Sequence, residues 1–407
     1  MTISHRIFKT FESLQVRDFR FLWLSMFFSM GAFQMQAIVQ SFYVYKLTSS
    51  ALILGLVTSG WAAPILVFSL FGGSLSDKIN RKRIIVLGEA VLFVFAILIG
   101  LTIAFNKDHW VLFLLNSMMQ GAMFSFMGPS RQSLIPQVVG KERITNALAL
   151  NSAAMTSTTF IAPGIGGVLY SLINPEGAFY VIAILRFLSF ALTQLISPIN
   201  AKILNTGSIS VVRGIIEGLN YLFNNKVILL LILSTMIAVL ASYPFQLLLP
   251  ILVVDVYKLE SEAYGFLISL IGLGSLVGSI FIAFIGKWKR GLLLVLGVFI
   301  SAISLLLVGL IPNYSVAAIL MILLGLGNTA PMTINMALIM DNTEDIFRGR
   351  MMSIIMMQWG LMPLGVLPFS WLIEQFSGQF AVLTMSIILF VVSIYILFFN
   401  SRVRDLD

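Results

Sequence analysis

The residues of this sequence that could do chemistry are amide, hydroxyl and ionisable side chains inside long apolar stretches. Three stretches carry polar side chains four or seven residues apart: Gln36, Gln40 and Tyr43; Asn116 and Gln120; and Asn328 and Asn335. A buried amide without a partner costs about 1 to 3 kcal/mol. These helix faces therefore either line a polar cavity that binds a substrate or hydrogen-bond to one another between helices.

Glu89 and Arg186 are ionisable residues well inside apolar stretches, where a charge is a candidate functional group. In one hypothesis they form a structural pair with each other. In the other, Glu89 belongs to a cytoplasmic switch with Asp77 and Arg131. If the protein moves protons, a partly buried carboxylate must carry them, and the candidates are Glu89 and then Asp341.

The densest charge cluster is in the segment GGSLSDKINRKRI, where Asp77 stands among four cations. Gly73 allows the backbone to turn sharply and to approach another helix. Asp77 can accept hydrogen bonds from a helix N-terminus or pair with an arginine of the other half, where Arg348 and Arg350 are the candidates. The alternative is a local pair with a cation of its own loop, such as Arg81.

The composition identifies the solvent around the chain. Of the 407 residues, 59% are hydrophobic and 10% are charged, whereas soluble domains carry about 25% charged residues. Most of the surface must therefore face lipid, and the chain is an integral membrane protein. With no Cys, two His and no phosphate-binding loop, we expect no metal, no cofactor, no enzymatic activity and no direct ATP hydrolysis.

Twelve apolar stretches are long enough to cross about 30 Å of hydrocarbon. They are residues 19–45, 51–72, 84–105, 110–129, 145–173, 177–197, 227–250, 264–285, 291–311, 315–340, 350–373 and 379–399. The first is too long for a signal peptide, so we expect it to remain as an anchor. An even number of crossings puts both termini on the same side of the membrane.

The distribution of Lys and Arg predicts which side that is. The predicted loops and termini place 21 of the 25 cations on the side of the termini, Arg131 among them, and three on the other side. Because cytoplasmic loops are enriched in Lys and Arg, both termini are predicted to be cytoplasmic. The net charge of +8 follows from this topology and requires no nucleic-acid partner, although it favours anionic lipid headgroups.

The longest loop divides the chain into an N-terminal six-helix bundle (1–197), a cytoplasmic linker (198–226) with a short surface helix at 211–223, and a C-terminal six-helix bundle (227–407). The halves are weakly similar: LILGLV in the second stretch returns as YGFLISLIG in the eighth, 210 residues later. Repeated six-helix halves with a site between them are typical of transporters.

Several motifs carry a family resemblance. GGSLSDKINRKR resembles the loop motif between the second and third helices of the major facilitator superfamily, and APGIGG, with Pro163, Gly166 and Gly167, resembles the fifth-helix motif of its antiporters. Four further segments resemble the bacterial exporters that include macrolide efflux pumps and the enterobactin exporter: VRDFRFLWLS, YKLTSSALILGLV, PSRQSLIPQVVGKERITNALALNS and RGRMMSIIMMQWGLMPLG.

The resemblance implies an all-α membrane protein of twelve transmembrane helices in two six-helix pseudo-repeats, with helices 1, 4, 7 and 10 around a central cavity. It also implies a conformational switch that closes the cytoplasmic side, formed by Gly73, Asp77, Arg81, Arg348 and Arg350. APGIGG would then act as a hinge that seals the halves against leakage. A plain packing interface is the other interpretation of its Pro and Gly residues.

The resulting expectation is a monomeric secondary transporter of the bacterial inner membrane that exports an amphiphilic drug or siderophore by alternating access, driven by protons. Abundant Met and Phe favour large, mostly apolar substrates with hydrogen-bonding groups. A lysophospholipid flippase of the same fold is the second hypothesis, and a non-transporting membrane receptor is the third. Two positions depart from the antiporter pattern: Ser117 replaces a frequent Arg, and the first helix has Gln34 and Gln36 where many members have an acid.

Overall fold

The computed structural model describes residues 11–68, 80–197, 211–286 and 289–399, which form helices and no strands. The N-terminal part contains η1 (Glu12–Gln15), α2 (Arg17–Thr48), α3 (Ala51–Ser59), α5 (Arg81–Ala104), α6 (Trp110–Val139), η2 (Lys141–Arg143) and α7 (Ile144–Gln194). Residues 62–68 continue the path of α3 as a further helical segment.

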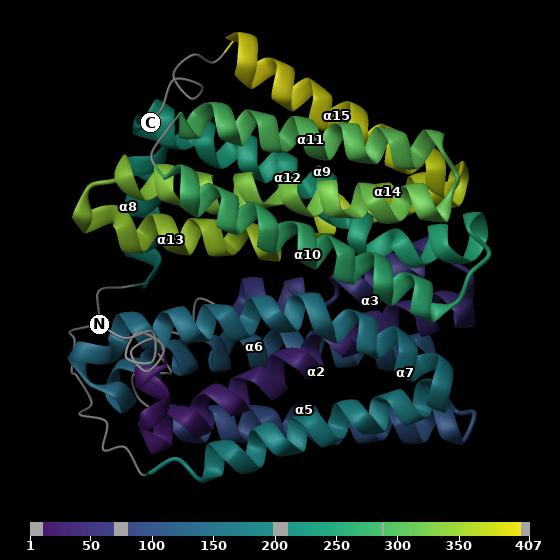
Figure 1. The fold of residues 1–407 in the computed structure, drawn as a ribbon, viewed down its shortest axis with the longest axis horizontal. Coiled ribbons are helices and arrows are strands. Elements are labelled where there is room, and N and C mark those ends of the chain that lie inside the picture. Colours follow the sequence, from purple (N-terminus) through teal and green to yellow (C-terminus); the bar gives the residue numbers. More distant parts are fainter. Residues whose placement is uncertain (1–10, 69–79, 198–210, 287–288, 400–407) are drawn as a thin grey trace, which may run out of the picture.

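Helix α8 (Val211–Asn224) precedes the C-terminal part. That part contains α9 (Lys226–Ile251), η3 (Leu252–Val256), α10 (Ser261–Ile285), α11 (Arg290–Leu310), α12 (Tyr314–Asp341), α13 (Asp345–Gly360), α14 (Pro363–Gln375) and α15 (Gly378–Phe399). The two parts form two bundles that lie side by side (Figure 1).

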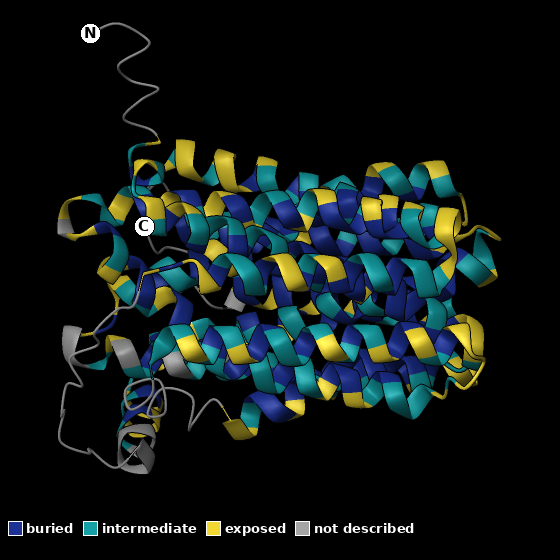
Figure 2. Cartoon of the chain, turned by 90° about the horizontal axis from the view of Figure 1, so that it is seen from below, coloured by how far each residue is buried: buried dark blue, intermediate teal, exposed yellow. Residues whose placement is uncertain are grey.

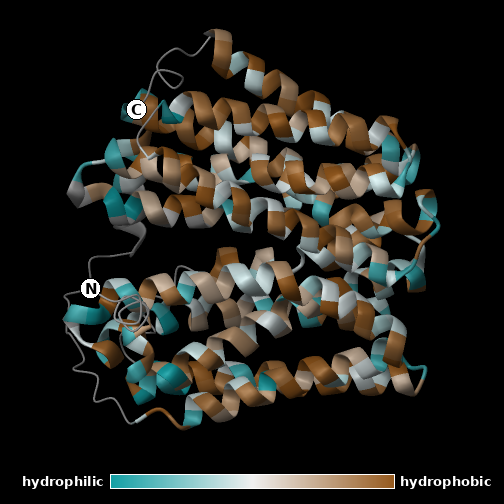
Figure 3. Ribbon diagram, in the orientation of Figure 1, coloured by the Kyte–Doolittle hydropathy of each residue, from teal (hydrophilic) through white to brown (hydrophobic). Residues whose placement is uncertain are grey.

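The surface of the molecule matches a lipid environment. Apolar residues cover the length of the helices, and hydrophilic residues gather toward the two ends (Figure 3). Exposed residues lie along the outer faces of the helices (Figure 2). Many exposed residues are large and apolar, such as Phe284 with an exposed fraction of 90%. Among the described residues, 11 helices are long and apolar enough to cross a membrane.

The helix count agrees with the predicted twelve once α7 is considered. This helix has 51 residues, and at 1.5 Å per residue it would be about 77 Å long, far more than one crossing requires. Its backbone leaves the helical conformation at Ile173 and Asn174, where Asn174 has φ 61° and is followed by Pro175. Two crossings therefore meet there, as the predicted stretches 145–173 and 177–197 required.

The bundle has two distinct ends. Helix α2 begins and α15 ends at the same end, here called the terminal end (Figure 1). The opposite end, where α2 leads into α3 and η3 leads into α10, is called the distal end. The cation distribution predicts that the terminal end faces the cytoplasm.

Helix α6 is longer than predicted, and this corrects the assignment of one cation. The predicted stretch ends at residue 129, but the helix continues to Val139 despite Pro129 and Pro136. Arg131 is therefore not a loop residue. It is a helical residue with an exposed fraction of 6%, so its charge must be compensated inside the protein rather than by solvent.

The linker helix was predicted at 211–223 and is present as α8. It packs against α13, with the rings of Tyr221 and Phe347 stacked at 4.1 Å between centroids. Glu217 of α8 also forms an ion pair with Arg350 of α13 at 2.7 Å. The linker helix is thereby attached to the C-terminal bundle at its terminal end.

Candidate functional site

A buried ion cluster lies in the N-terminal bundle, centred on Glu89 of α5. Its carboxylate Oε1 is 2.6 Å from Arg131 Nη2 of α6, and its Oε2 is 3.6 Å from Arg186 Nη1 of α7. Ser29 of α2 donates a hydrogen bond to Oε1 and accepts one from Arg186 at 3.2 Å. The exposed fractions are 0% for Glu89, 6% for Arg131 and 2% for Arg186, so three charges are withdrawn from solvent.

Hydroxyl groups extend this cluster. Ser189 of α7 accepts a hydrogen bond from Arg131 Nη2 at 3.4 Å. Ser25 of α2 contacts Ser189 at 3.1 Å and Thr193 at 2.7 Å. Because Ser25 and Ser29 are one helical turn apart, they share a face of α2. The four-residue spacing of Ser25 and Ser29 is present in the sequence. The candidates predicted from polar residues in apolar stretches were amides, a tyrosine and charged side chains, and these serines were therefore missed.

The cluster has an excess of positive charge. Two guanidinium groups face one carboxylate, and several of their nitrogens have no hydrogen-bond partner: Nε and Nη1 of Arg131, and Nε and Nη2 of Arg186. Guanidinium N–H groups deep in a protein are costly to leave unpaired. The site therefore holds unused hydrogen-bond donors and unbalanced charge.

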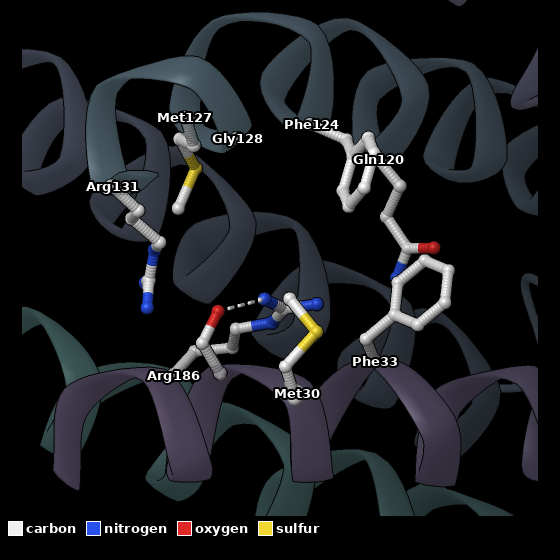
Figure 4. A pocket seen from close by; sticks show the side chains of 9 residues that line it. Met30, Phe33, Gln120, Phe124, Met127, Gly128, Arg131 and Arg186 are labelled. Carbon is white, nitrogen blue, oxygen red and sulfur yellow. Dashed lines mark hydrogen bonds between the residues drawn. The ribbon is translucent and has the colours of Figure 1, made fainter. Parts of the chain in front are cut away.

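The two arginines that carry these donors line a pocket of about 40 Å³ between α2, α6 and α7. Its lining residues are Ser29, Met30, Phe33, Gln120, Phe124, Met127, Gly128, Arg131 and Arg186. Figure 4 shows Arg131 and Arg186 at one side of the pocket and the rings of Phe33 and Phe124 at the other. The accessible surface of the pocket is almost entirely apolar, and the two arginines lie behind it on one side.

The predicted cavity amides of the N-terminal half divide into two groups. Asn116 donates to Gln40 at 2.7 Å, and Gln40 donates to Ser117 at 2.7 Å, so these groups join α2 to α6. Gln120 lines the pocket, and its Nε2 is buried without a partner. Gln36 is buried on α2.

The remaining predicted cavity residues have different surroundings. Tyr43 donates a hydrogen bond to Asp108 at 2.8 Å. In the C-terminal half, Asn328 of α12 accepts hydrogen bonds from Ser242 of α9 at 2.9 Å and from Ser301 of α11 at 3.0 Å. Asn335 is buried and its Oδ1 has no partner. Gln120 and Asn335 are therefore the predicted amides with unsatisfied buried atoms.

The motif APGIGG lies where the two halves meet. A Cβ on Gly167 would come 2.5 Å from the Ser261 carbonyl oxygen of α10, and one on Gly265 would come 2.5 Å from the Pro163 carbonyl oxygen. Gly166 instead faces α2, where its Cβ would be 3.2 Å from Met35 Cα. The motif thus allows α7 to approach one helix of each half without intervening side chains.

Polar contacts join the halves near the distal end. Lys46 forms an ion pair with Glu260, and Tyr45 donates a hydrogen bond to Asp255. Glu374 accepts hydrogen bonds from Ser50 Oγ at 3.0 Å and from the Leu52 amide at 2.9 Å. Ser261 donates to the Gly167 carbonyl at 2.9 Å. The distal ends of α2, α3 and α7 are therefore bridged to the C-terminal half.

The described residues of the predicted switch, Arg81, Arg348 and Arg350, lie at the terminal end. Gly73 and Asp77 are outside the described residues, and Arg81 is the first residue of α5. Arg348 donates to the Met340 carbonyl at 3.1 Å, and Arg350 pairs with Glu217 as described above. Asp341 forms an ion pair with Arg290 at 2.8 Å and its side chain is 48% exposed, which distinguishes it from the fully buried Glu89.

A comparison with protein families decides the identity of the fold. The profile of the Major Facilitator Superfamily matches residues 22–366. The chain belongs to this superfamily. It is a multi-pass membrane transporter of the major facilitator type, which confirms the family and the helical architecture predicted from the motifs.

The relatives by sequence include exporters of drugs and siderophores. The chain is 24% identical over 372 residues to a staphyloferrin A transporter of Staphylococcus aureus, covering 89% of this chain and 91% of that protein. It is 22% identical over 362 residues to macrolide efflux protein A of Streptococcus pyogenes, covering 85% and 88%. It is 22% identical over 342 residues to the enterobactin exporter EntS of Shigella boydii, covering 82% and 79%.

Solved structures confirm the fold. The nucleoside transporter NupG superposes with a TM-score of 0.77 at 12% identity, covering 93% of this chain and 98% of that one. A bacterial homologue of the lysosomal transporter Spinster, in an inward-facing unoccupied conformation, superposes with a TM-score of 0.74 at 15% identity, covering 96% and 98%. At these identities the likeness concerns the major facilitator fold alone.

Proposed function

We propose that this major facilitator is a secondary exporter that moves an amphiphilic organic compound out of the cytoplasm by alternating access. The observation that carries this proposal is the ion cluster of Glu89, Arg131 and Arg186, buried inside helices that cross the membrane and bordering a pocket. A structural scaffold in lipid has little reason to keep three charges there, because each is costly to bury. A transporter uses such groups to bind and release its cargo.

The distal contacts support the same proposal. They bridge the halves at the end predicted to face outward, while the pocket lies deeper toward the terminal end. Glu89 is eight residues from the start of α5, about 12 Å along the helix axis. This arrangement fits the inward-facing member of an alternating pair, in which the substrate enters from the cytoplasm and the distal contacts later break.

Proton coupling is part of the proposal, with Glu89 as the first candidate and Asp341 as the second. A proton-driven exporter needs a carboxylate that exchanges a proton between the two faces, and Glu89 lies deepest among the acids of the predicted spans. In proteoliposomes with an imposed pH gradient, a macrolide and a siderophore would be offered as substrates. Glu89→Gln should abolish gradient-driven accumulation, and the matched Asp341→Asn should reveal any contribution from the exposed acid.

Two results would contradict this mechanism in different ways. If both variants still accumulate substrate with the gradient, the proton does not pass through these acids. If the parent protein transports equally well with and without the gradient, it is a facilitator or uses another ion. The panel should include a lysophospholipid, since preferential movement of that probe would identify a flippase of the same fold.

The conformational switch is tested separately. If Asp77 pairs with the arginines near the start of α13, loss of a charge-assisted hydrogen bond of about 1.5 to 3 kcal/mol shifts the conformational equilibrium about 10- to 150-fold. Asp77→Asn should then abolish export while the protein stays folded and inserted. Cysteine probes placed at the terminal end should become more reactive. Full export by Asp77→Asn would reduce Asp77 to an ordinary loop charge.

A further inference from the structure

We infer that the pocket between α2, α6 and α7 binds an anionic group of about the size of a carboxylate. The inference rests on the proposed function, because the anion is taken to be part of the exported compound. It goes further by assigning a chemical class to the substrate and by naming the residues that would hold it: Arg131, Arg186 and Gln120.

The first argument is charge. Two arginines against one glutamate leave one unit of positive charge inside the membrane-spanning part of the protein. Glu89 pairs with both arginines, yet both arginines also line the pocket and carry buried nitrogens without a hydrogen-bond partner. An anion would remove the excess charge and satisfy these donors at once. Guanidinium groups also match carboxylates geometrically through paired hydrogen bonds.

The second argument is size. A volume of about 40 Å³ holds roughly three water-sized spheres, which is also the number of heavy atoms in a carboxylate. The neutral donor Gln120 Nε2, buried without a partner, borders the same space. The pocket is therefore large enough for a charged group of a few heavy atoms.

The third argument concerns the rest of the ligand. The rings of Phe33 and Phe124 stack at 6.4 Å between centroids beside the pocket, and Met30 and Met127 complete its apolar side. Phe124 has an exposed fraction of 44%, so this side leads toward the surface of α6. An aromatic or apolar body next to the carboxylate would lie against these side chains.

The C-terminal half provides a matched control. Arg290 is also a buried arginine, with an exposed fraction of 8%, and its Nη2 donates to Asp341 at 2.8 Å. Neither Arg290 nor Asp341 is among the residues that line the pocket. The variant Arg290→Gln therefore shows how the loss of a buried arginine affects the protein when the pocket is left intact.

The test uses the full chain purified in detergent and compares benzoate with benzamide, which has nearly the same shape but no charge. Ionic strength is held constant with sodium chloride. Benzoate should raise the thermal unfolding midpoint in a saturable manner and benzamide should not. Arg131→Gln and Arg186→Gln should each weaken the apparent affinity for benzoate about 10- to 150-fold, the range for one charge-assisted hydrogen bond. Arg290→Gln should leave the affinity unchanged.

Glu89→Gln should change the affinity for benzoate in the opposite direction, so it separates an effect on binding from an effect on folding. Removing the competing carboxylate should strengthen benzoate binding even if the unliganded variant is less stable. The proposal is wrong if benzoate and benzamide act alike, if Arg186→Gln or the charge-retaining Arg186→Lys keeps the parent affinity, or if Glu89→Gln weakens binding. Because no transport is measured, an exporter that transports but fails this test would refute the anion site alone.

Discussion

The two halves of this transporter differ in the polar groups that they bury inside the membrane. The N-terminal half buries the charges of Glu89, Arg131 and Arg186 around a pocket. The C-terminal half holds a neutral network in which Asn328 accepts hydrogen bonds from two serine hydroxyls. Its buried arginine, Arg290, lies at the start of α11 rather than inside it.

This difference indicates which half is more suited to bind a substrate. Neutral hydroxyl and amide groups in a membrane protein stabilise helix packing by modest amounts, whereas buried charges are retained at a cost that packing does not require. The N-terminal half is therefore the half that we assign to substrate binding and coupling.

The largest expected effect is the loss of the carboxylate from the charged half. Glu89→Ala removes the one acid between two buried guanidinium groups, and breaking a buried pair in this way costs about 3 to 5 kcal/mol. We expect a large drop in the thermal unfolding midpoint of the purified protein. Asp341→Ala is the control, because the carboxylate of Asp341 is half exposed whereas that of Glu89 is fully buried. Equal losses in the two variants would remove the distinction between the halves.

The next effect concerns the interface between the halves. Gly167→Ala places a Cβ 2.5 Å from the Ser261 backbone, which forces α7 and α10 apart, and such overpacking costs about 1 to 3 kcal/mol. We expect reduced transport and greater access of cysteine probes to the distal end. Gly31→Ala on α2 is the control, since its Cβ would meet no atom within 4 Å. Unchanged probe access in Gly167→Ala would show that the close approach does not hold the distal end shut.

Much of the fold could be predicted from the sequence, because a membrane limits the structures that a chain can form. Each span needs about 20 apolar residues, so hydropathy located the crossings, and the linker helix followed from its position between them. The boundary between the predicted stretches 145–173 and 177–197 coincides with the break of α7 at Ile173 and Asn174. The extent of α6 was underestimated because prolines usually end a helix. Inside a packed bundle, neighbouring helices satisfy the freed carbonyl groups, so Pro129 and Pro136 did not end α6.

The candidate site was harder to predict. Glu89 and Arg186 stood out as charges in apolar stretches, and the structure joins them with Arg131, so elements of both hypotheses occur together. The sequence could not supply this triad, because periodicity fixes which face of a helix a residue occupies but not which face of another helix meets it. For the same reason Gln40 and Asn116 were recognised as polar positions, while their mutual hydrogen bond depends on how α2 rotates against α6.

A smaller effect is expected from the neutral half. Asn328→Ala removes the acceptor for Ser242 and Ser301, but serine hydroxyls in helices can turn to the carbonyl four residues earlier. The loss should therefore be about 1 kcal/mol, visible as a small shift of the unfolding midpoint with transport retained. The double variant Ser242→Ala/Ser301→Ala should shift it similarly. If Asn328→Ala instead abolished transport at normal stability, the C-terminal half would also contain a substrate-binding group.

The smallest effect belongs to the ion pair that joins the halves at the distal surface. Lys46 and Glu260 have side-chain exposed fractions of 38% and 64%, so water and salt screen their attraction, and such pairs contribute about 0 to 1 kcal/mol. Lys46→Gln should leave the unfolding midpoint almost unchanged and should slightly favour opening of the distal end at low salt. Raising the salt concentration should erase the difference between Lys46→Gln and the parent protein in cysteine-probe access. A large effect that persists at high salt would mean that this pair acts as a buried latch, and the N-terminal cluster would then not be the dominant electrostatic feature of the transport cycle.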